Sequence, residues 1–132
     1  MEVSRLSFLK QLLSTPGPSG DEEAAARAWR AEARGFADSV YADVSGNSYA
    51  VLDGPGPRIL LAGHIDEIGL MVTYIDDEGF LGFGAVGGWD AQVLVGQRVR
   101  LLGPAGEVIG VIGKKPIHLL KPDERSQAST IE

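Results

Sequence analysis

The fold of this chain is decided by the stretch Arg58-Ile59-Leu60-Leu61-Ala62-Gly63-His64-Ile65-Asp66-Glu67-Ile68-Gly69-Leu70-Met71-Val72. Its first half is short and aliphatic and follows a Gly-Pro-Gly-Pro breaker, so it predicts a buried strand over residues 58–63. His64 and Asp66 come directly after that strand. Side chains two residues apart lie on one face of an extended chain, so this pair can serve one site while Ile65 points away.

The position of His64 and Asp66 makes them the best candidates in the chain for catalytic or ligand-binding residues. In open α/β sheets, ligand sites lie beyond the carboxyl ends of the strands. The alternative is a polar strand end that faces water and has no chemical role. The residues alone leave both possibilities open.

The residues before this stretch predict two helices. Apolar residues recur at helical spacing over Val3–Leu13, and the helix should end before the proline-rich loop Ser14–Pro18. Ser19 and Glu22 have the spacing of a capping box, with Ser19 as N-cap and Glu22 at N3. The second helix is expected to end with Gly35 as its C′ residue.

The hydrophobic period changes to two after the second helix. Asp38–Val44 and Tyr49–Leu52 therefore predict two strands, joined by a turn at Ser45–Ser48. The strand over 58–63 follows them. The order of two helices and then strands is typical of the start of an α/β domain with a mixed sheet.

From Ile68 onward the sequence predicts closely spaced strands with glycine-rich turns and no helix. This pattern of short strands and turns is typical of a small β-barrel, and it predicts a domain boundary near residues 67–70. The predicted strands are Gly69–Ile75, Phe80–Val86, Gln97–Leu102 and Val108–Gly113.

Composition and charge exclude several classes of function. The formal net charge is −6, and the excess of acidic over basic residues is the same in both halves. The chain therefore lacks the basic surface that nucleic-acid binding requires. The chain has no cysteine, so any metal site must use histidine and carboxylates. No apolar run approaches the ~20 residues of a membrane span, and the charged N-terminus does not read as a signal peptide. We expect a cytoplasmic protein that does not associate with membranes.

Four motifs in order resemble one known family, the glutamyl and deblocking aminopeptidases, which are dinuclear-metal peptidases that assemble into tetrahedral shells. The first metal motif of that family resembles Leu61–Val72. Its N-terminal loop and helix start are similar to Gly17–Glu22, and its inserted barrel is similar to Gly87–Asp90 followed by Leu94–Gln97. A later strand and loop resemble Gly110–Gly113, Lys115–His118 and Lys121–Arg125.

The resemblance implies a zinc-peptidase-like α/β domain with a small β-barrel inserted into it. Residues 1–68 are then the N-terminal part of the catalytic domain, and residues 69–132 are the dimerisation and assembly barrel, truncated at its C-terminal end. The implied reaction is removal of N-terminal residues from peptides by a water that two divalent metal ions, zinc or cobalt, activate. The implied partners are a peptide substrate and further copies of the chain, as a dimer that builds a tetrahedral dodecamer.

The resemblance also assigns roles to the motif residues. His64 corresponds to a metal ligand, and Asp66 corresponds to the catalytic-site carboxylate that orients it. Glu67 matches the motif but receives no catalytic role, and His118 matches a barrel loop and not a ligand. The other ligands of the family follow the barrel and are absent from this sequence, so we expect the chain alone to be inactive.

Two alternatives to an enzyme fragment follow from the sequence. The first is a non-catalytic barrel module for interaction or assembly. The second is a glycan-binding or glycan-cleaving protein that uses Asp66 and Glu67, although neighbouring residues on a strand point to opposite faces and suit a shared substrate badly. A different pair of carboxylates, such as Asp66 with Asp90, stays open for this alternative.

Overall fold

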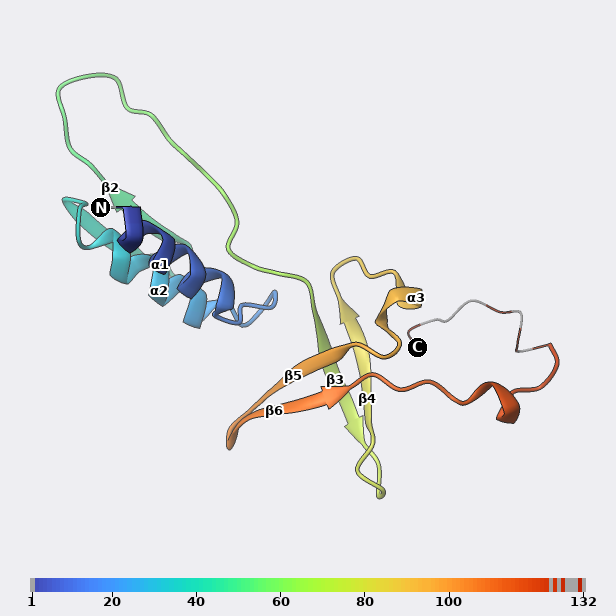
Figure 1. Cartoon of the computed structure of the whole chain (residues 1–132). Helices are drawn as coiled ribbons and strands as arrows, with labels where there is room; N and C mark the ends of the chain where they lie inside the picture. The colour runs from blue at the N-terminus through green and yellow to red at the C-terminus, as the bar shows by residue number, and fades with distance from the viewer. Residues whose placement is uncertain (1, 124, 126, 128–130, 132) are drawn as a thin grey trace. The chain divides into compact units, whose positions relative to one another are not determined.

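The computed structural model describes residues 2–123, 125, 127 and 131 (Figure 1). The chain divides into two compact units, an N-terminal unit of residues 1–70 and a C-terminal unit of residues 71–132. Glu124, which belongs to the last motif of the resemblance, and Glu132, the predicted end of the barrel domain, lie outside the described residues.

Two helices open the N-terminal unit, as predicted. Helix α1 spans Glu2–Ser14 and helix α2 spans Glu23–Ala33. Gly35 follows the C-cap residue Arg34, which confirms its predicted place. The buried residues of α2 recur at helical spacing and form the core of the unit; they are Ala25, Ala26, Arg30 and Ala33. Among the described residues, no helix is both long and apolar enough to cross a membrane.

The predicted capping box at the start of α2 is wrong. The helix begins at Glu23, and the side chain of its N-cap residue, Glu22, caps none of the described helix N–H groups. Glu22 Oε1 instead accepts a hydrogen bond from the Gly20 backbone N–H at 2.6 Å. The Ser19 hydroxyl donates to Asp66, 47 residues away in the sequence. Residues 17–19 are bound to this distant segment, so the helix starts only after the chain has turned away from it.

The predicted hairpin is confirmed and packs against α2. Strands β1, Ser39–Ala42, and β2, Ser48–Val51, pair antiparallel. The rings of Tyr41 and Tyr49 stack across the pair with centroids 4.9 Å apart. Helix α2 contacts both strands and also α1. The hairpin and the two helices therefore form a small α/β layer.

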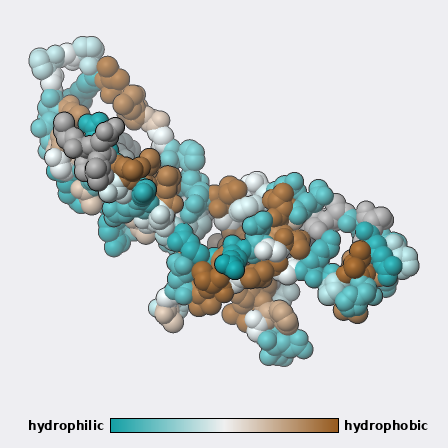
Figure 2. All heavy atoms as spheres, viewed as in Figure 1, coloured by the Kyte–Doolittle hydropathy of each residue, from teal (hydrophilic) through white to brown (hydrophobic). Residues whose placement is uncertain are grey.

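The predicted buried strand over residues 58–63 is wrong, because the segment is an extended connection (Figure 1). Ile59, Leu60 and Leu61 are 82%, 84% and 91% exposed. Figure 2 shows hydrophobic residues along this connection. A strand needs a neighbour for its backbone groups, and the described residues of this unit place none beside 58–63. The first backbone pairing after the connection is the isolated parallel bridge between Pro18 and Glu67.

The C-terminal unit contains the four predicted strands, each within two residues of its predicted bounds. Strand β3, Gly69–Ile75, which begins in the N-terminal unit, pairs with β4, Leu81–Val86; the two run in opposite directions in Figure 1. Strand β5, Arg98–Gly103, pairs antiparallel with β6, Gly106–Val111. The expectation of no helix is wrong, because a short helix α3 spans Ala91–Leu94 and a 3₁₀ turn η1 spans Ile117–Leu119.

The fold class is therefore α/β, as expected, but the described residues contain neither the expected mixed sheet of the first domain nor a closed barrel. Each sheet there has two strands. The buried apolar side chains of the C-terminal unit are Leu94 and Ile112. The Ile112 backbone extends the β5–β6 ladder by bonding to Gly96 and Gln97 at 2.9 Å each. Closure into a barrel stays a prediction.

Candidate metal-binding site

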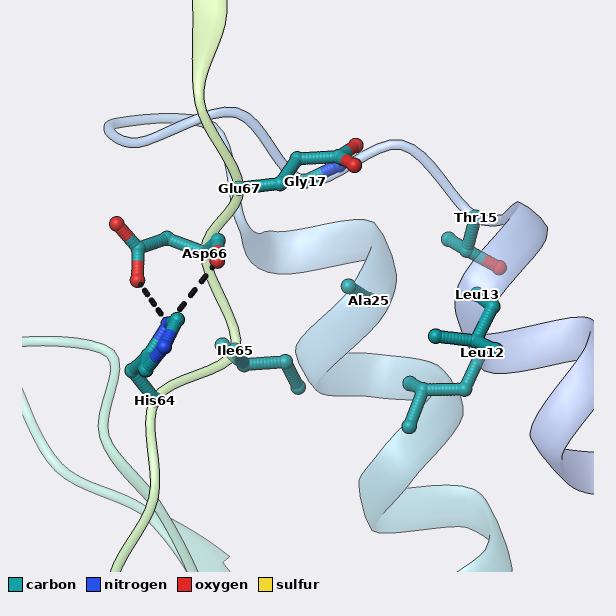
Figure 3. A pocket seen from close by; sticks show the side chains of 9 residues that line it. All are labelled: Leu12, Leu13, Thr15, Gly17, Ala25, His64, Ile65, Asp66 and Glu67. Atoms are coloured by element: carbon teal, nitrogen blue, oxygen red, sulfur yellow. Dashed lines mark hydrogen bonds and ion pairs between the residues drawn. The ribbon is translucent and has the colours of Figure 1, made fainter. Parts of the chain in front are cut away.

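His64 and Asp66 lie on one face of the connection and contact each other, as the sequence predicted (Figure 3). His64 Nδ1 lies 2.9 Å from Asp66 Oδ1 and 3.1 Å from the Asp66 backbone oxygen. Figure 3 shows Ile65 pointing the other way, toward α1 and α2. The alternation of an extended chain therefore places the two polar side chains together.

The contact decides which nitrogen of His64 carries the proton. Both partners of Nδ1, the ionised carboxylate and the backbone carbonyl, are acceptors only. Nδ1 must therefore be the donor, and Nε2 of the neutral ring keeps its lone pair. The side chain of His64 is 85% exposed, so Nε2 is accessible to a ligand. A carboxylate on one ring nitrogen and a lone pair on the other is the usual arrangement of a metal-ligating histidine.

Asp66 is held from its other side by Ser19. The Ser19 hydroxyl donates to Asp66 Oδ2 at 2.5 Å. This hydrogen bond, and then the contact with His64, hold the pKa of Asp66 below its ordinary value. Asp66 is therefore ionised at neutral pH and able to accept both contacts.

The loop Gly17–Ser19 is bound to Glu67 by several hydrogen bonds. The Glu67 N–H donates to the Gly17 carbonyl at 2.8 Å, and the Ser19 N–H donates to the Glu67 carbonyl at 3.1 Å. The Gly17 N–H donates to the Glu67 side chain at 3.1 Å. Glu67, which received no role from the sequence, thus fixes the loop beside the motif.

Two glycines lie where the loop packs closely against its neighbours. A Cβ at Gly17 would lie 3.1 Å from the Cβ of Ala25. A Cβ at Gly69 would lie 2.8 Å from the Cβ of Pro18, closer than non-bonded carbon atoms pack. We infer that the glycine at position 69 is required for contact with the loop.

An open hollow of ≈ 240 Å³ lies between the two helices and the motif (Figure 3). Leu12, Leu13 and Ala25 supply its apolar wall, and residues 64–67 line its other side. In Figure 3 the side chains of Asp66 and Glu67 point to opposite sides of the backbone. The pair is therefore not arranged for the two-carboxylate chemistry of glycan cleavage.

The described residues do not form a complete metal site. They contain no group of three or more His, Asp or Glu side chains placed to hold one ion. His118 lies in η1 of the C-terminal unit and is exposed. A catalytic zinc normally takes three protein ligands and an open position. His64, oriented by Asp66, therefore fits the role of one ligand in such a site.

Ser19 is the residue of this site that sequence reasoning missed. Its spacing to Glu22 matched a local helix signal, and its true partner lies 47 positions away. No local pattern reports a contact at that separation. The order of the motifs was the only signal, since it brought the loop and the metal motif into one resemblance.

Comparisons with known proteins agree on one family. The family model described as M42 glutamyl aminopeptidase matches residues 46–132. A lysyl aminopeptidase from Pyrococcus furiosus is 34% identical over 126 residues, which cover 95% of this chain and 36% of the relative.

Solved structures give the same result. A TET aminopeptidase from the marine sediment archaeon Thaumarchaeota archaeon SCGC AB-539-E09 superposes with a TM-score of 0.90 at 40% identity; the match covers 96% of this chain and 36% of that one. The Pyrococcus horikoshii TET1 peptidase, described as able to assemble into a tetrahedron or a large octahedral shell, has a TM-score of 0.76 at 37% identity and covers 96% and 37%. The chain spans about a third of the length of the curated relatives it matches.

Proposed function

This chain belongs to the M42 glutamyl aminopeptidase family, and from that membership we propose that it is part of a metal-dependent aminopeptidase that removes N-terminal residues from peptides. The resemblance found in the sequence motifs is thereby confirmed at the level of the family. The observation that carries the proposal is the contact between His64 Nδ1 and Asp66 Oδ1 at 2.9 Å. It leaves the Nε2 lone pair for a metal ion, where an aminopeptidase of this kind needs a ligand.

In the proposed mechanism, His64 would hold a metal ion through Nε2, and Asp66 holds the proton on Nδ1. A bound pair of divalent ions, zinc or cobalt, would supply an acidified water and polarise the scissile carbonyl. Asp66 keeps the ring in one tautomer and one orientation and makes Nε2 more basic. It acts on the metal through His64 and is a positioning residue. We propose that the other ligands come from the rest of the complete protein.

The proposed domain boundary lies two residues before the boundary between the two compact units. Residues 1–68 form the N-terminal part of the catalytic α/β domain, and residues 69–132 form the barrel that is inserted into it. The hairpin β5–β6 and the sheet β3–β4 are the pieces of that barrel in this chain. We propose that the complete protein is a homo-oligomer, because the solved relatives include peptidases described as a dodecamer and as shells.

The test of the activity uses the complete protein and aminoacyl p-nitroanilide substrates. We expect release of p-nitroaniline that a chelator abolishes and that zinc or cobalt restores. His64→Ala should lower activity by about 10³-fold or more, since the Lewis acid contributes several kcal/mol. The matched control is the variant His118→Ala, which should bind as much metal as the unsubstituted protein. A complete protein without chelator-sensitive release would contradict the proposal.

The assembly needs a separate measurement. Light scattering coupled to size exclusion should give a mass that is a multiple of the complete chain. A monomer at high concentration would contradict the assembly without touching the activity.

A further inference from the structure

We propose that Ser19 is a positioning residue of the metal site: its hydroxyl fixes the rotation of the Asp66 carboxylate, which in turn orients the ring of His64. Figure 3 shows the contact between Asp66 and His64. The inference rests on the proposed function for its consequence, the metal affinity. Its structural part, the orientation of His64, concerns residues of this chain alone.

The geometry of the carboxylate supports this role. Asp66 Oδ1 faces His64 and Oδ2 faces Ser19, so each oxygen has a partner on a different side. The torsion that turns a carboxylate is broad and has no single preferred angle. With two partners the group is held at one angle. Without the hydroxyl, Oδ2 would turn to water, and the Oδ1 contact would lose its support.

Ser19 is itself rigidly placed. Its N–H bonds to the Glu67 carbonyl at 3.1 Å, so the hydroxyl emerges beside the residue that precedes Glu67. The hydroxyl also lies 3.5 Å from that carbonyl, a much longer contact than the 2.5 Å to Asp66. A hydroxyl has one proton to donate, so the shorter contact takes it. The loop therefore aims the donor at the carboxylate.

The other role considered for Ser19 is that of N-cap of helix α2, but Ser19 does not occupy that position. Helix α2 begins four residues later with Glu22 as its N-cap residue. The remaining rival is a purely structural hydrogen bond that fastens the loop. That role predicts a loss of stability on removal of the hydroxyl, with no change at the ring of His64.

The direct test measures the tautomer of His64 in the absence of metal. The chain has two histidines, so ¹⁵N-labelled histidine gives two sets of ring signals, and His118→Ala assigns them. At a pH where both rings are neutral, we expect the Nδ1–H form to predominate at His64. Ser19→Ala should lower the ratio of Nδ1–H to Nε2–H by about two- to tenfold, the worth of one net hydrogen bond. Ser19→Thr keeps the hydroxyl and should restore the ratio.

The second arm measures zinc affinity of the complete protein by competition with a chelator. We expect Ser19→Ala to weaken binding by about tenfold, the lower end for groups that orient a ligand. Ser19→Thr should recover most of that loss. Ser45→Ala, the same change at an exposed turn position, should have no effect. Thermal unfolding of the metal-free variants shows whether the loop has come loose.

The two arms separate the inference from the proposed function. An unchanged His64 tautomer ratio in Ser19→Ala overturns the inference, whatever the metal does. So does a loss of affinity that Ser19→Thr fails to recover and that follows the loss of thermal stability. A wild-type protein that binds no zinc, together with a Ser19-dependent tautomer, would instead remove the proposed function and leave the orienting contact in place.

Discussion

The hairpin of residues 39–51 and the motif segment of residues 58–63 teach different lessons, although both were predicted as strands from short apolar patterns. The hairpin forms because its partner strand lies directly across a turn, and α2 covers it. The motif segment carries the stronger aliphatic run, yet Leu60 is 84% exposed. An apolar run therefore shows that a segment can pair, whereas the position of its neighbours decides whether it does.

The motif changes character within a few residues. Before Gly63 it has no partner among the described residues, and from His64 to Glu67 it is bound to the loop Gly17–Ser19. The hydrogen-bonded end of the motif is the end that carries the candidate ligand. The site is therefore held by these long-range hydrogen bonds between residues 17–19 and 66–67, here called the clip, rather than by a sheet.

The clip should break most completely at Gly69. In Gly69→Ala the new Cβ meets the rigid ring of Pro18 at 2.8 Å, so the loop must move. We expect a loss of about 2–3 kcal/mol, in the upper range for overpacking. Urea denaturation of this chain measures it. Gly54→Ala is the control, because a Cβ there meets nothing within 4 Å. Equal stability of the two variants would show that the contact between Gly69 and Pro18 is unimportant.

The hairpin has its own anchor in Arg30, which is 9% exposed. Its guanidinium donates to Ser48 Oγ at 2.9 Å and to Glu23 at 3.0 Å, and so joins α2 to β2. Arg30→Ala should cost about 1.5–2 kcal/mol, because hydrogen bonds of a charged group and its packed stem are lost.

Arg27 provides the matched control for Arg30. It contacts the same Glu23 carboxylate at 3.3 Å, but its side chain is 71% exposed. Arg27→Ala should change the free energy of unfolding by about 0.5 kcal/mol or less, as surface ion pairs do. Similar losses for the two variants would mean that burial and Ser48 add nothing to the anchor.

The sequence predicted the elements whose signals are local. Helical spacing gave α1, and alternation gave β1 and β2, because each forms within its own neighbourhood. The predictions of a strand at 58–63, of a helix start at Ser19 and of no helix after Ile68 were wrong. Each of these depends on contacts or turns that a local window does not contain. At the site, alternation was enough to place His64 beside Asp66, but a partner 47 positions away was beyond it.

The turn of the hairpin should respond to acid. The side-chain amide of Asn47 first, and then backbone N–H groups and the Tyr49 hydroxyl, hold the pKa of Asp43 below its ordinary value. Because the folded pKa is lowered, this stabilisation is present at neutral pH and is lost as the pH falls below the ordinary carboxyl range. Chemical shifts of Val40 and Ala50, followed from neutral to strongly acidic pH, measure it. These shifts should change in one step at acidic pH, and Asp43→Asn should abolish that step. If the step survives in this variant, another group causes it.

The smallest effect is expected at the most exposed part of the motif. Leu60→Ser should change the stability of this chain by less than about 0.5 kcal/mol, as surface changes do. Val40→Ser, the comparable change in a strand that has formed, should cost about 1 kcal/mol, because Val40 is half-buried opposite Ala50.

The complete protein should reverse that order. If residues 58–63 join a sheet there, Leu60→Ser removes a core side chain and should cost about 2–5 kcal/mol. Chemical denaturation of both variants, in this chain and in the complete protein, gives the four values needed. A loss above 1 kcal/mol for Leu60→Ser in this chain would mean that the segment is already packed. An equally small loss in the complete protein would mean that the aliphatic run never becomes a strand, and the difference between the two segments would then lie in the segments themselves rather than in their neighbours.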